Sequence, residues 1–279
     1  ATMVMATDPD TDRVGIGVRN AENEFILLNG NQAFSLMMWF IMKSLKDRSN
    51  AYIAKTIVTS ELVDLMAKDY GIECFNTLTG FKYIAELMRN LEGKKKFIAA
   101  GEESYGYMAG DFVRDKDAVS ACAFFAAMAA SAADENKSLY DWLIEMYAEH
   151  AYYKEALINV TKKGQQGEQE IKAMMEKFRN SPPATINNSA VTRLLDYQTL
   201  TEKDLSSGKT TQLDFPKSDV IQFYLEDGTK VSVRPSGTEP KIKFYISANT
   251  KLASKNDFDA ATKKLDEKIK GVEQYLQSI

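Results

Sequence analysis

Apolar and polar positions follow two different patterns along the chain. Between residues 31 and 150, short apolar runs typical of strands are separated by stretches with the spacing of amphipathic helices. The expected strands lie at 51–58, 72–76 and 97–100, and the expected helices at 34–45, 61–70, 81–91 and from 118 onward. Strands separated by helices of this length indicate a mostly parallel sheet. We therefore expect a mixed α/β domain over residues 31–150.

The pattern changes after residue 150. Strand-like runs lie at 152–160, 220–225, 230–234 and 242–248, and helical spacing at 167–178 and 257–276. An Asp-Gly pair at 227–228 predicts a hairpin turn between two of these strands. Strands grouped between helices are typical of an α+β domain, so we expect a second, smaller domain over residues 151–279.

The first 30 residues look incomplete as a folding unit. A short apolar run at 3–6 leads into an acidic turn, and a hairpin follows with strands at 14–18 and 24–28. Because a hairpin this small cannot bury a core alone, we expect its partner strands upstream and interpret residues 1–30 as the remnant of a preceding α/β domain. An unpaired edge of this kind could also pair with a second copy, which predicts a homodimer through the hairpin.

Composition narrows the class of protein. A chain that is 44% hydrophobic and 27% charged is an ordinary globular protein, and a net charge of −4 argues against nucleic acid or an anionic membrane as a partner. No apolar run is long enough to cross a bilayer, and the Ala-rich stretch at 118–133 predicts a buried core helix. Cys74 and Cys122 form no ligand cluster and suit a reducing cytoplasm.

The acidic turn is the first candidate site. Asp8, Asp10 and Asp12 alternate directly after an apolar run, so their carboxylates could converge as the hard oxygen ligands that Mg²⁺ prefers. A solvated acidic turn is the alternative. A calcium-binding EF-hand is excluded, because its sixth and twelfth positions would be Arg13 and Arg19. Arg13 suits a site where a phosphoryl group is held beside the metal, although it could also serve as a charge partner for the carboxylates.

A second constellation follows the expected strand at 97–100. Gly101-Glu-Glu-Ser-Tyr-Gly106 sets two acids and a hydroxyl between glycines, beyond the carboxyl end of a strand where ligands of α/β sheets lie. Such side chains could hydrogen-bond vicinal sugar hydroxyls, although an exposed turn would look the same. Thr79-Gly-Phe-Lys82 and Arg114-Asp-Lys-Asp117 each precede an expected helix, and both would also serve as helix starts.

The third constellation is Arg234-Pro-Ser-Gly-Thr-Glu-Pro-Lys241, between two expected strands. It offers a bidentate guanidinium, two hydroxyls, an unobstructed amide at Gly237 and a second cation, held between two prolines that restrict the backbone. These are the parts of a phosphate site, and a plain hairpin tip does not explain so many anion donors. A Walker loop is excluded, because its glycine-lysine spacing and following helix are absent.

The order of these motifs resembles the α-D-phosphohexomutases, the phosphoglucomutase/phosphomannomutase family. The first and last motifs are specific, and the match in order spans most of the chain. The resemblance implies four domains, of which residues 1–30 would end domain II, residues 31–150 would form domain III and residues 151–279 would form domain IV. It also implies interconversion of hexose 1-phosphate and hexose 6-phosphate, with glucose favoured, through a phosphoserine enzyme and a hexose 1,6-bisphosphate.

The resemblance also implies roles for residues in this chain. The metal ligands for Mg²⁺ would be Asp8, Asp10 and Asp12, with Arg13 beside the phosphoserine and Lys116 as the basic residue near the reacting hydroxyl. The sugar hydroxyls would be held by Thr79, Gly80, Glu102, Glu103 and Ser104. The phosphate that is not transferred would be held by Arg234, Ser236, Gly237, Thr238 and Lys241.

One departure from the family pattern bears on activity. The family's nucleophile lies in a Thr-x-Ser-His-Asn-Pro type loop, whereas the single histidine of this chain, His150, follows Glu149. We therefore expect the chain alone to be inactive as a mutase. A sugar-phosphate-binding module without catalysis is the alternative function, and a mutase acting on pentose or amino-sugar phosphates is a third.

Overall fold

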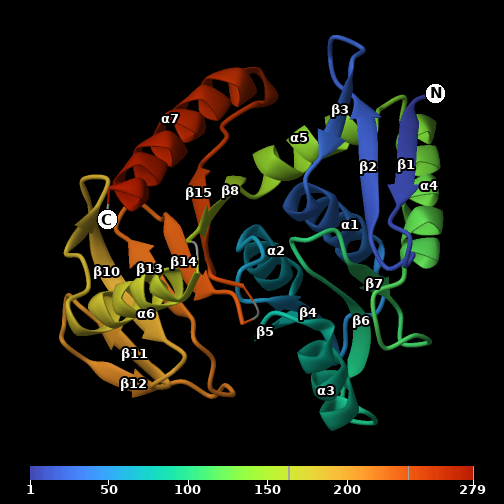
Figure 1. Cartoon of the computed structure of the whole chain (residues 1–279). Coiled ribbons are helices and arrows are strands. Elements are labelled where there is room, and N and C mark those ends of the chain that lie inside the picture. Colours follow the sequence, from blue (N-terminus) through green and yellow to red (C-terminus); the bar gives the residue numbers. More distant parts are fainter. Residues whose placement is uncertain (163, 238, 279) are drawn as a thin grey trace. The chain divides into compact units, whose positions relative to one another are not determined.

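The computed structural model describes residues 1–162, 164–237 and 239–278 of the chain, which forms two compact units (Figure 1). Unit 1 comprises Ala1–Tyr152 with Lys251–Phe258, and unit 2 comprises Tyr153–Thr250 with Asp259–Ile279. Unit 1 contains both the N-terminal hairpin and the α/β layer, and the further division at residue 30 stays a prediction.

The N-terminal hairpin is part of a small antiparallel sheet. Its strands are β1 (Met3–Thr7), β2 (Val14–Arg19) and β3 (Phe25–Leu28), with β2 in the centre. Alternate residues Val14, Ile16 and Val18 of β2 are buried, as expected for a sheet with one covered face. Helix α4 lies beside β1 and covers part of this face (Figure 1). Pairing of this sheet with a second copy stays a prediction.

The α/β layer of unit 1 follows the predicted alternation. Its elements in chain order are α1 (Gly30–Ser44), β4 (Ala51–Thr56), α2 (Leu62–Tyr70), β5 (Glu73–Thr77), α3 (Phe81–Leu91), β6 (Lys96–Gly101), β7 (Tyr107–Ala109), α4 (Ala118–Asp134) and α5 (Leu139–Glu149). The sheet order is β5-β4-β6-β7, with β4 parallel to β5 and to β6, and β7 antiparallel. The carboxyl ends of β4, β5 and β6 therefore meet at one edge, which is where ligands of such sheets bind.

Local signals explain where the helices of this layer begin and end. Asn29 and Gln32 form a capping box at the start of α1, in which each side chain accepts from the other's backbone N–H. Helix α2 ends at Gly71, whose φ of 69° lies in the left-handed region that glycine tolerates best. Helix α3 was predicted over residues 81–91, and these bounds are confirmed.

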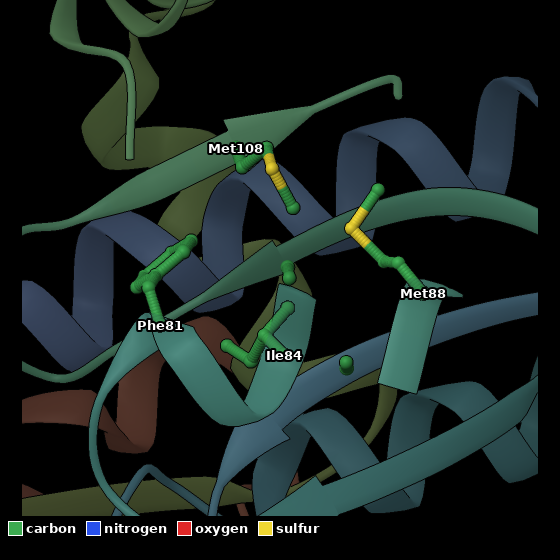
Figure 2. Close-up of a cluster of buried hydrophobic side chains, with 6 residues drawn as sticks. Phe81, Ile84, Met88 and Met108 are labelled. Carbon is green, nitrogen blue, oxygen red and sulfur yellow. The ribbon is translucent and has the colours of Figure 1, made fainter. Parts of the chain in front are cut away.

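Helix α3 packs on the sheet through an apolar cluster (Figure 2). Phe81, Ile84 and Met88 come from one face of α3, and Met108 comes from the edge strand β7. All four are at most 5% exposed. Burial of four large apolar side chains stabilises this junction by several kcal/mol in total, at about 1.5–3 kcal/mol for each. The packing fixes the start of α3, and therefore the Thr79–Lys82 segment, against the carboxyl ends of β4 and β6.

The Ala-rich helix α4, which was predicted as a buried core helix, is buried on one face. Ala121, Phe125 and Met128 are buried along one face, whereas Val119 on the other side is 67% exposed. Within the described residues no single helix is long and apolar enough to span a membrane, and α4 and α5, which pass that test together by length and composition, bend by 85° at their junction.

Unit 2 is built around a sheet whose strand pairings between residues 185 and 250 are all antiparallel, and it contains two long helices. Its strands follow the order β12-β11-β10-β13-β14-β15-β8, and β9 pairs with β10. The elements are β8 (Tyr152–Thr161), α6 (Gly164–Asn180), β9 (Thr185–Ile186), β10 (Ser189–Asp196), β11 (Thr201–Asp204), β12 (Thr210–Gln212), β13 (Ile221–Leu225), β14 (Lys230–Pro235), β15 (Lys241–Thr250) and α7 (Phe258–Gln277), with a short 3-10 turn η1 (Lys255–Asp257) in unit 1. The α+β prediction is confirmed, but β9 to β12 were not predicted.

Candidate active site

The acidic turn between β1 and β2 is organised by Asp8. Its Oδ1 accepts from the backbone N–H groups of Asp12 and Arg13, each at 3.2 Å, which closes the turn around the carboxylate. Partial desolvation raises the pKa of Asp8, but the hydrogen bonds from Arg13 and Asp12 outweigh it and hold the pKa below its ordinary value. Asp8 is therefore ionised at neutral pH.

Two cations occupy the space between the carboxylates of this turn. Arg13 Nη1 lies 3.3 Å from Asp8 Oδ2 and 3.2 Å from Asp12 Oδ1, and Lys116 Nζ lies 3.0 Å from Asp12 Oδ2. Asp10 is exposed and makes no hydrogen bond or ion pair with the described residues. Throughout the described ranges, no three acidic, His or Cys side chains are grouped as a metal site would group them. The expected convergence of three aspartates is thus not seen, because the cations draw Asp8 and Asp12 toward themselves.

The donor chemistry of the turn nevertheless fits Mg²⁺. Three carboxylates within five residues supply hard oxygen ligands, and Asp8 is held in its charged form by the backbone. Arg13 is exposed, so its side chain can leave the carboxylates without a change of backbone, whereas the Lys116 side chain is only 13% exposed. The assignment of Asp8, Asp10 and Asp12 as metal ligands stays a prediction.

The Gly101–Gly106 loop is attached directly to the acidic turn. The N–H of Val14 donates to the carbonyl of Tyr105 at 3.2 Å, and Arg13 pairs with Gly106 in an isolated antiparallel bridge. Tyr105 has a φ of 69°, a left-handed conformation that costs a residue with a Cβ about 1–2 kcal/mol. This strained turn aims the Tyr105 carbonyl at the first residue of β2, so the loop and the turn form one continuous surface of unit 1.

Glu102 and Ser104 form the polar face of this loop. Glu102 Oε1 accepts from the backbone N–H of Gly80 at 2.9 Å, and Ser104 Oγ donates to Glu102 Oε2 at 3.3 Å. Burial, followed by the charge of Glu103, raises the pKa of Glu102 above its ordinary value. The expected proximity of Gly80, Glu102 and Ser104 is therefore present, whereas the side chain of Thr79 makes no hydrogen bond with the described residues.

Lys116 links these segments. In addition to Asp12, its Nζ contacts Asp115 Oδ1 at 3.2 Å and lies 5.2 Å from the centre of the Phe81 ring. A Cβ on Gly106 would lie 2.4 Å from Lys116 Cδ, so the absence of a side chain at Gly106 lets the lysine stem cross the loop. Burial lowers the pKa of Lys116, but the hydrogen bonds that its Nζ donates to Asp12 and Asp115 outweigh burial and raise the pKa overall, which keeps the side chain cationic.

The Arg234–Lys241 loop of unit 2 joins β14 to β15. Its ends are closed by a hydrogen bond from the N–H of Ser236 to the carbonyl of Lys241 at 2.7 Å. Gly237 is exposed and has open space around it, so its amide is accessible to an anion. Neither Arg234 nor Lys241 is ion-paired with another described residue. Thr238, which was also predicted to bind phosphate, lies outside the described residues.

A hollow of about 200 Å³ adjoins this loop inside unit 2. Pro235, Ser236, Glu239 and Pro240 line it from the loop, and Lys172 lines it from α6. The loop is thus open on one side, and its donors Arg234, Gly237 and Lys241 offer the charge and the amide that a phosphate needs.

Comparison with known proteins assigns the chain to a family. The family described as phosphoglucomutase/phosphomannomutase, alpha/beta/alpha domain III, matches residues 29–150, and the phosphoglucomutase/phosphomannomutase C-terminal domain matches residues 157–265. The chain belongs to the phosphoglucomutase/phosphomannomutase family. A phosphoglucomutase of Staphylococcus aureus strain MRSA252 is 35% identical over 96% of this chain and 48% of its own length. The chain therefore spans about half the length of the curated relatives it matches.

Solved structures show the same fold at low sequence identity. The open form of the Paramecium phosphoprotein parafusin, a phosphoglucomutase, matches with a TM-score of 0.63 at 18% identity, covering 98% of this chain and 46% of its own. An N-acetylphosphoglucosamine mutase of Aspergillus fumigatus, in complex with GlcNAc-6P and magnesium, matches with a TM-score of 0.50 at 13% identity, covering 96% of this chain and 52% of its own. At these identities the likeness concerns the fold.

Some residues of the site were missed from the sequence. Thr56 and Thr59, at the carboxyl end of β4, donate to the carboxylate of Glu103, and Lys55 beside them is buried and charged. The signal was present, because Lys55-Thr56-Ile-Val-Thr59 places polar residues where a buried parallel strand ends, which is the edge that carries ligand sites.

Proposed function

We propose that this chain carries the metal, sugar and phosphate segments of a phosphohexomutase that interconverts hexose 1-phosphate and hexose 6-phosphate, with glucose as the favoured sugar and mannose as the second. The observation that carries the proposal is the joining of four predicted motifs in unit 1. Lys116 contacts Asp12 of the acidic turn, Gly80 donates to Glu102, and Tyr105 accepts from the first residue after Arg13. Four motifs that are far apart in the sequence therefore lie on one surface of unit 1.

The acidic turn would hold the divalent ion. Asp8, Asp10 and Asp12 would bind Mg²⁺, which when bound neutralises charge on a phosphoryl oxygen. Magnesium in the Aspergillus mutase, which shares the fold, supports this assignment. Arg13 and Lys116, released from the carboxylates, would then face the phosphoryl group and the sugar hydroxyl that receives it. Such transfers depend on positioning and charge neutralisation, which explains why cations surround the turn.

The sugar and its second phosphate would be held by different segments. Glu102 and Ser104, with Gly80, would bind vicinal hydroxyls of the hexose, since a buried carboxylate is a strong acceptor for hydroxyl donors. Arg234, Ser236, Gly237, Thr238 and Lys241 would bind the phosphate that is not transferred. The GlcNAc-6P in the Aspergillus mutase supports a sugar phosphate as the ligand. A hexose 1,6-bisphosphate would be the intermediate and activator, and the cytoplasm the compartment.

Binding of glucose 6-phosphate to the purified chain, measured by isothermal titration calorimetry, tests the phosphate assignment. Arg234→Lys should weaken binding about tenfold, because lysine cannot reproduce a bidentate guanidinium contact. Arg193→Lys is the matched control. Arg193 lies in the same unit but outside the loop, and its Nη1 is 3.2 Å from Glu202 Oε1. Equal loss in both variants, or no loss in Arg234→Lys, would contradict the assignment.

Mutase turnover provides a separate test. We infer that the chain alone does not convert glucose 1-phosphate to glucose 6-phosphate, because it contains no Ser-His pair of the kind that carries the family's phosphoserine. A coupled dehydrogenase assay with glucose 1,6-bisphosphate present should show no conversion above the rate without protein. Robust conversion would show that another group in this chain accepts the phosphoryl group.

A further inference from the structure

The carboxylate of Glu103 accepts hydrogen bonds from two threonines. Its Oε2 accepts from Thr56 Oγ1 at 3.1 Å and from Thr59 Oγ1 at 3.2 Å, and the two hydroxyls lie 2.8 Å from each other. Both threonines are 0% exposed. A half-buried carboxylate that accepts two hydroxyls is well satisfied, and its removal would leave one of these buried hydroxyls without an acceptor even if the other donates to its neighbour.

The threonine pair is itself fixed by a buried lysine. Lys55 is 1% exposed, and its Nζ contacts the Thr59 carbonyl at 3.3 Å, Asn76 Oδ1 at 2.6 Å and Asp64 Oδ2 at 2.8 Å. The N–H of Thr59 also donates to the Thr56 carbonyl at 3.0 Å. These contacts hold the turn at residues 56–59 in place at the carboxyl end of β4, with both threonine hydroxyls directed toward the 101–106 loop.

Glu102 and Glu103 are adjacent but have different hydrogen-bond partners. Glu102 accepts from Gly80 and from Ser104, whereas the carboxylate of Glu103 accepts from Thr56 of β4. The backbone of the loop also rests on helix α1, since a Cβ on Gly30 would lie 1.8 Å from the Glu103 carbonyl oxygen. The Glu103 side chain and carbonyl are therefore both used to seat the loop on the α/β layer.

We propose that Glu103 is a positioning residue, which anchors the 101–106 loop to Thr56 and Thr59 so that Glu102 and Ser104 are presented to vicinal hydroxyls of a hexose phosphate. This replaces its sequence-based assignment as a sugar-binding residue, and it rests on the proposed function of Glu102 and Ser104. The competing role is direct contact between the Glu103 carboxylate and the sugar.

Removal of the threonine hydroxyls distinguishes the two roles. Thr56→Val/Thr59→Val leaves the Glu103 carboxylate in place but takes away its anchor, so positioning predicts about tenfold weaker binding of glucose 6-phosphate by calorimetry. Glu103→Ala should weaken binding by a similar factor, and Glu103→Gln, which keeps an acceptor oxygen, should restore it to within about twofold. Thr192→Val, at a threonine of unit 2 that donates to the Tyr224 carbonyl, is the matched control.

Direct contact predicts another pattern. Both Glu103 variants would then lose binding while the double valine variant kept it, and that result would overturn the proposal. Equal binding by wild type, Glu103→Ala and the double variant would overturn it as well.

Hydrogen exchange gives a readout that needs no ligand. The N–H of Glu102 donates to the Gly106 carbonyl and the N–H of Val14 to the Tyr105 carbonyl, so both amides report the seating of the loop. We expect about tenfold faster exchange at these two amides in Glu103→Ala and in the double valine variant. The N–H of Ile57, which donates to Thr77 at 2.8 Å, should exchange as in wild type in Glu103→Ala.

The two readouts separate the proposals. If the wild-type chain binds no glucose 6-phosphate, the proposed sugar site fails, while faster exchange at Glu102 and Val14 would still establish the anchor. Unchanged exchange at both amides would overturn the anchor even if sugar binding is observed. A uniform rise at all amides, including Ile57, would indicate a general loss of stability and would also overturn it.

Discussion

Gly30→Ala tests whether the loop is seated on helix α1. Alanine normally stabilises a helix by up to about 1 kcal/mol relative to glycine, so helix propensity alone predicts a more stable protein. The added Cβ would, however, lie 1.8 Å from the Glu103 carbonyl oxygen and 2.6 Å from its carbonyl carbon. Backbone atoms cannot rotate away, so the loop would have to move by roughly 1.5 Å to reach ordinary van der Waals contact.

The two effects oppose each other, and the clash is the larger. Overpacking of a close contact costs about 1–3 kcal/mol, and the upper part of this range applies because the obstacle is backbone. We expect a net decrease of about 2 kcal/mol in the unfolding free energy of unit 1. Gly15→Ala is the matched control, since its Cβ would meet atoms no nearer than 3.8 Å and should change stability by less than about 0.5 kcal/mol.

Tryptophan fluorescence in urea is a suitable assay. Both tryptophans, Trp39 and Trp142, lie in unit 1 with their rings 5.7 Å apart, so the signal reports this unit separately from unit 2. The chain is not expected to unfold in one step, and a probe confined to one unit avoids that complication. A Gly30→Ala variant as stable as wild type, or more stable, would refute the seating of the loop on α1.

Three further predictions concern the same surface. Lys116→Met should tighten Mg²⁺ binding severalfold in calorimetry, because it removes a cation 3.0 Å from Asp12, and unchanged or weaker binding would count against the turn as the metal site. Glu102→Gln should stabilise the protein at pH 7, because the raised pKa of Glu102 means that the folded state binds its proton more tightly than the unfolded state. The charged form of Glu102 therefore costs stability above the folded-state pKa. The stability advantage of the variant should fade as the pH falls through that pKa toward 4.5 and below. An advantage that does not change between pH 4 and 8 would contradict this cause. Tyr105→Gly should raise stability by about 0.5–1 kcal/mol through relief of its left-handed φ, and a loss of stability in the fluorescence assay would show that the tyrosine side chain contributes more than the strain costs.

The sequence predicted the elements that carry strong local signals. Helix α3 begins after Gly80 and has a regular apolar face at Phe81, Ile84 and Met88, and its predicted bounds are confirmed. Strands β11 and β12 were missed, because Thr201–Asp204 and Thr210–Gln212 are polar and mostly exposed, and their pairing depends on β10. An outer strand without a buried face has no alternation to detect.

The candidate site also contains parts that could be predicted from the sequence and parts that could not. The motifs and their order could be recognised, because each is a short local pattern that follows a strand. The contact of Lys116 with Asp12 could not be predicted, since it depends on the pairing of Arg13 with Gly106 between segments far apart in the chain. The anchoring of Glu103 likewise depends on Thr56, which lies 47 residues earlier.

Charge balance gives these contacts a common cause. The acidic turn and the 101–106 loop bring five carboxylates to one surface of unit 1, where unpaired they would repel one another and the phosphate of a substrate. Each receives a different compensation: cations at Asp8 and Asp12, backbone and hydroxyl donors at Glu102, threonines at Glu103, and solvent at Asp10. The compensating cation Arg13 is exposed at the acidic turn, whereas Lys55 and the two threonines beside Glu103 are buried. Under the proposed function, Arg13 would give way to a metal ion and a phosphoryl group at the acidic turn, while the buried anchor of Glu103 would keep the 101–106 loop in place.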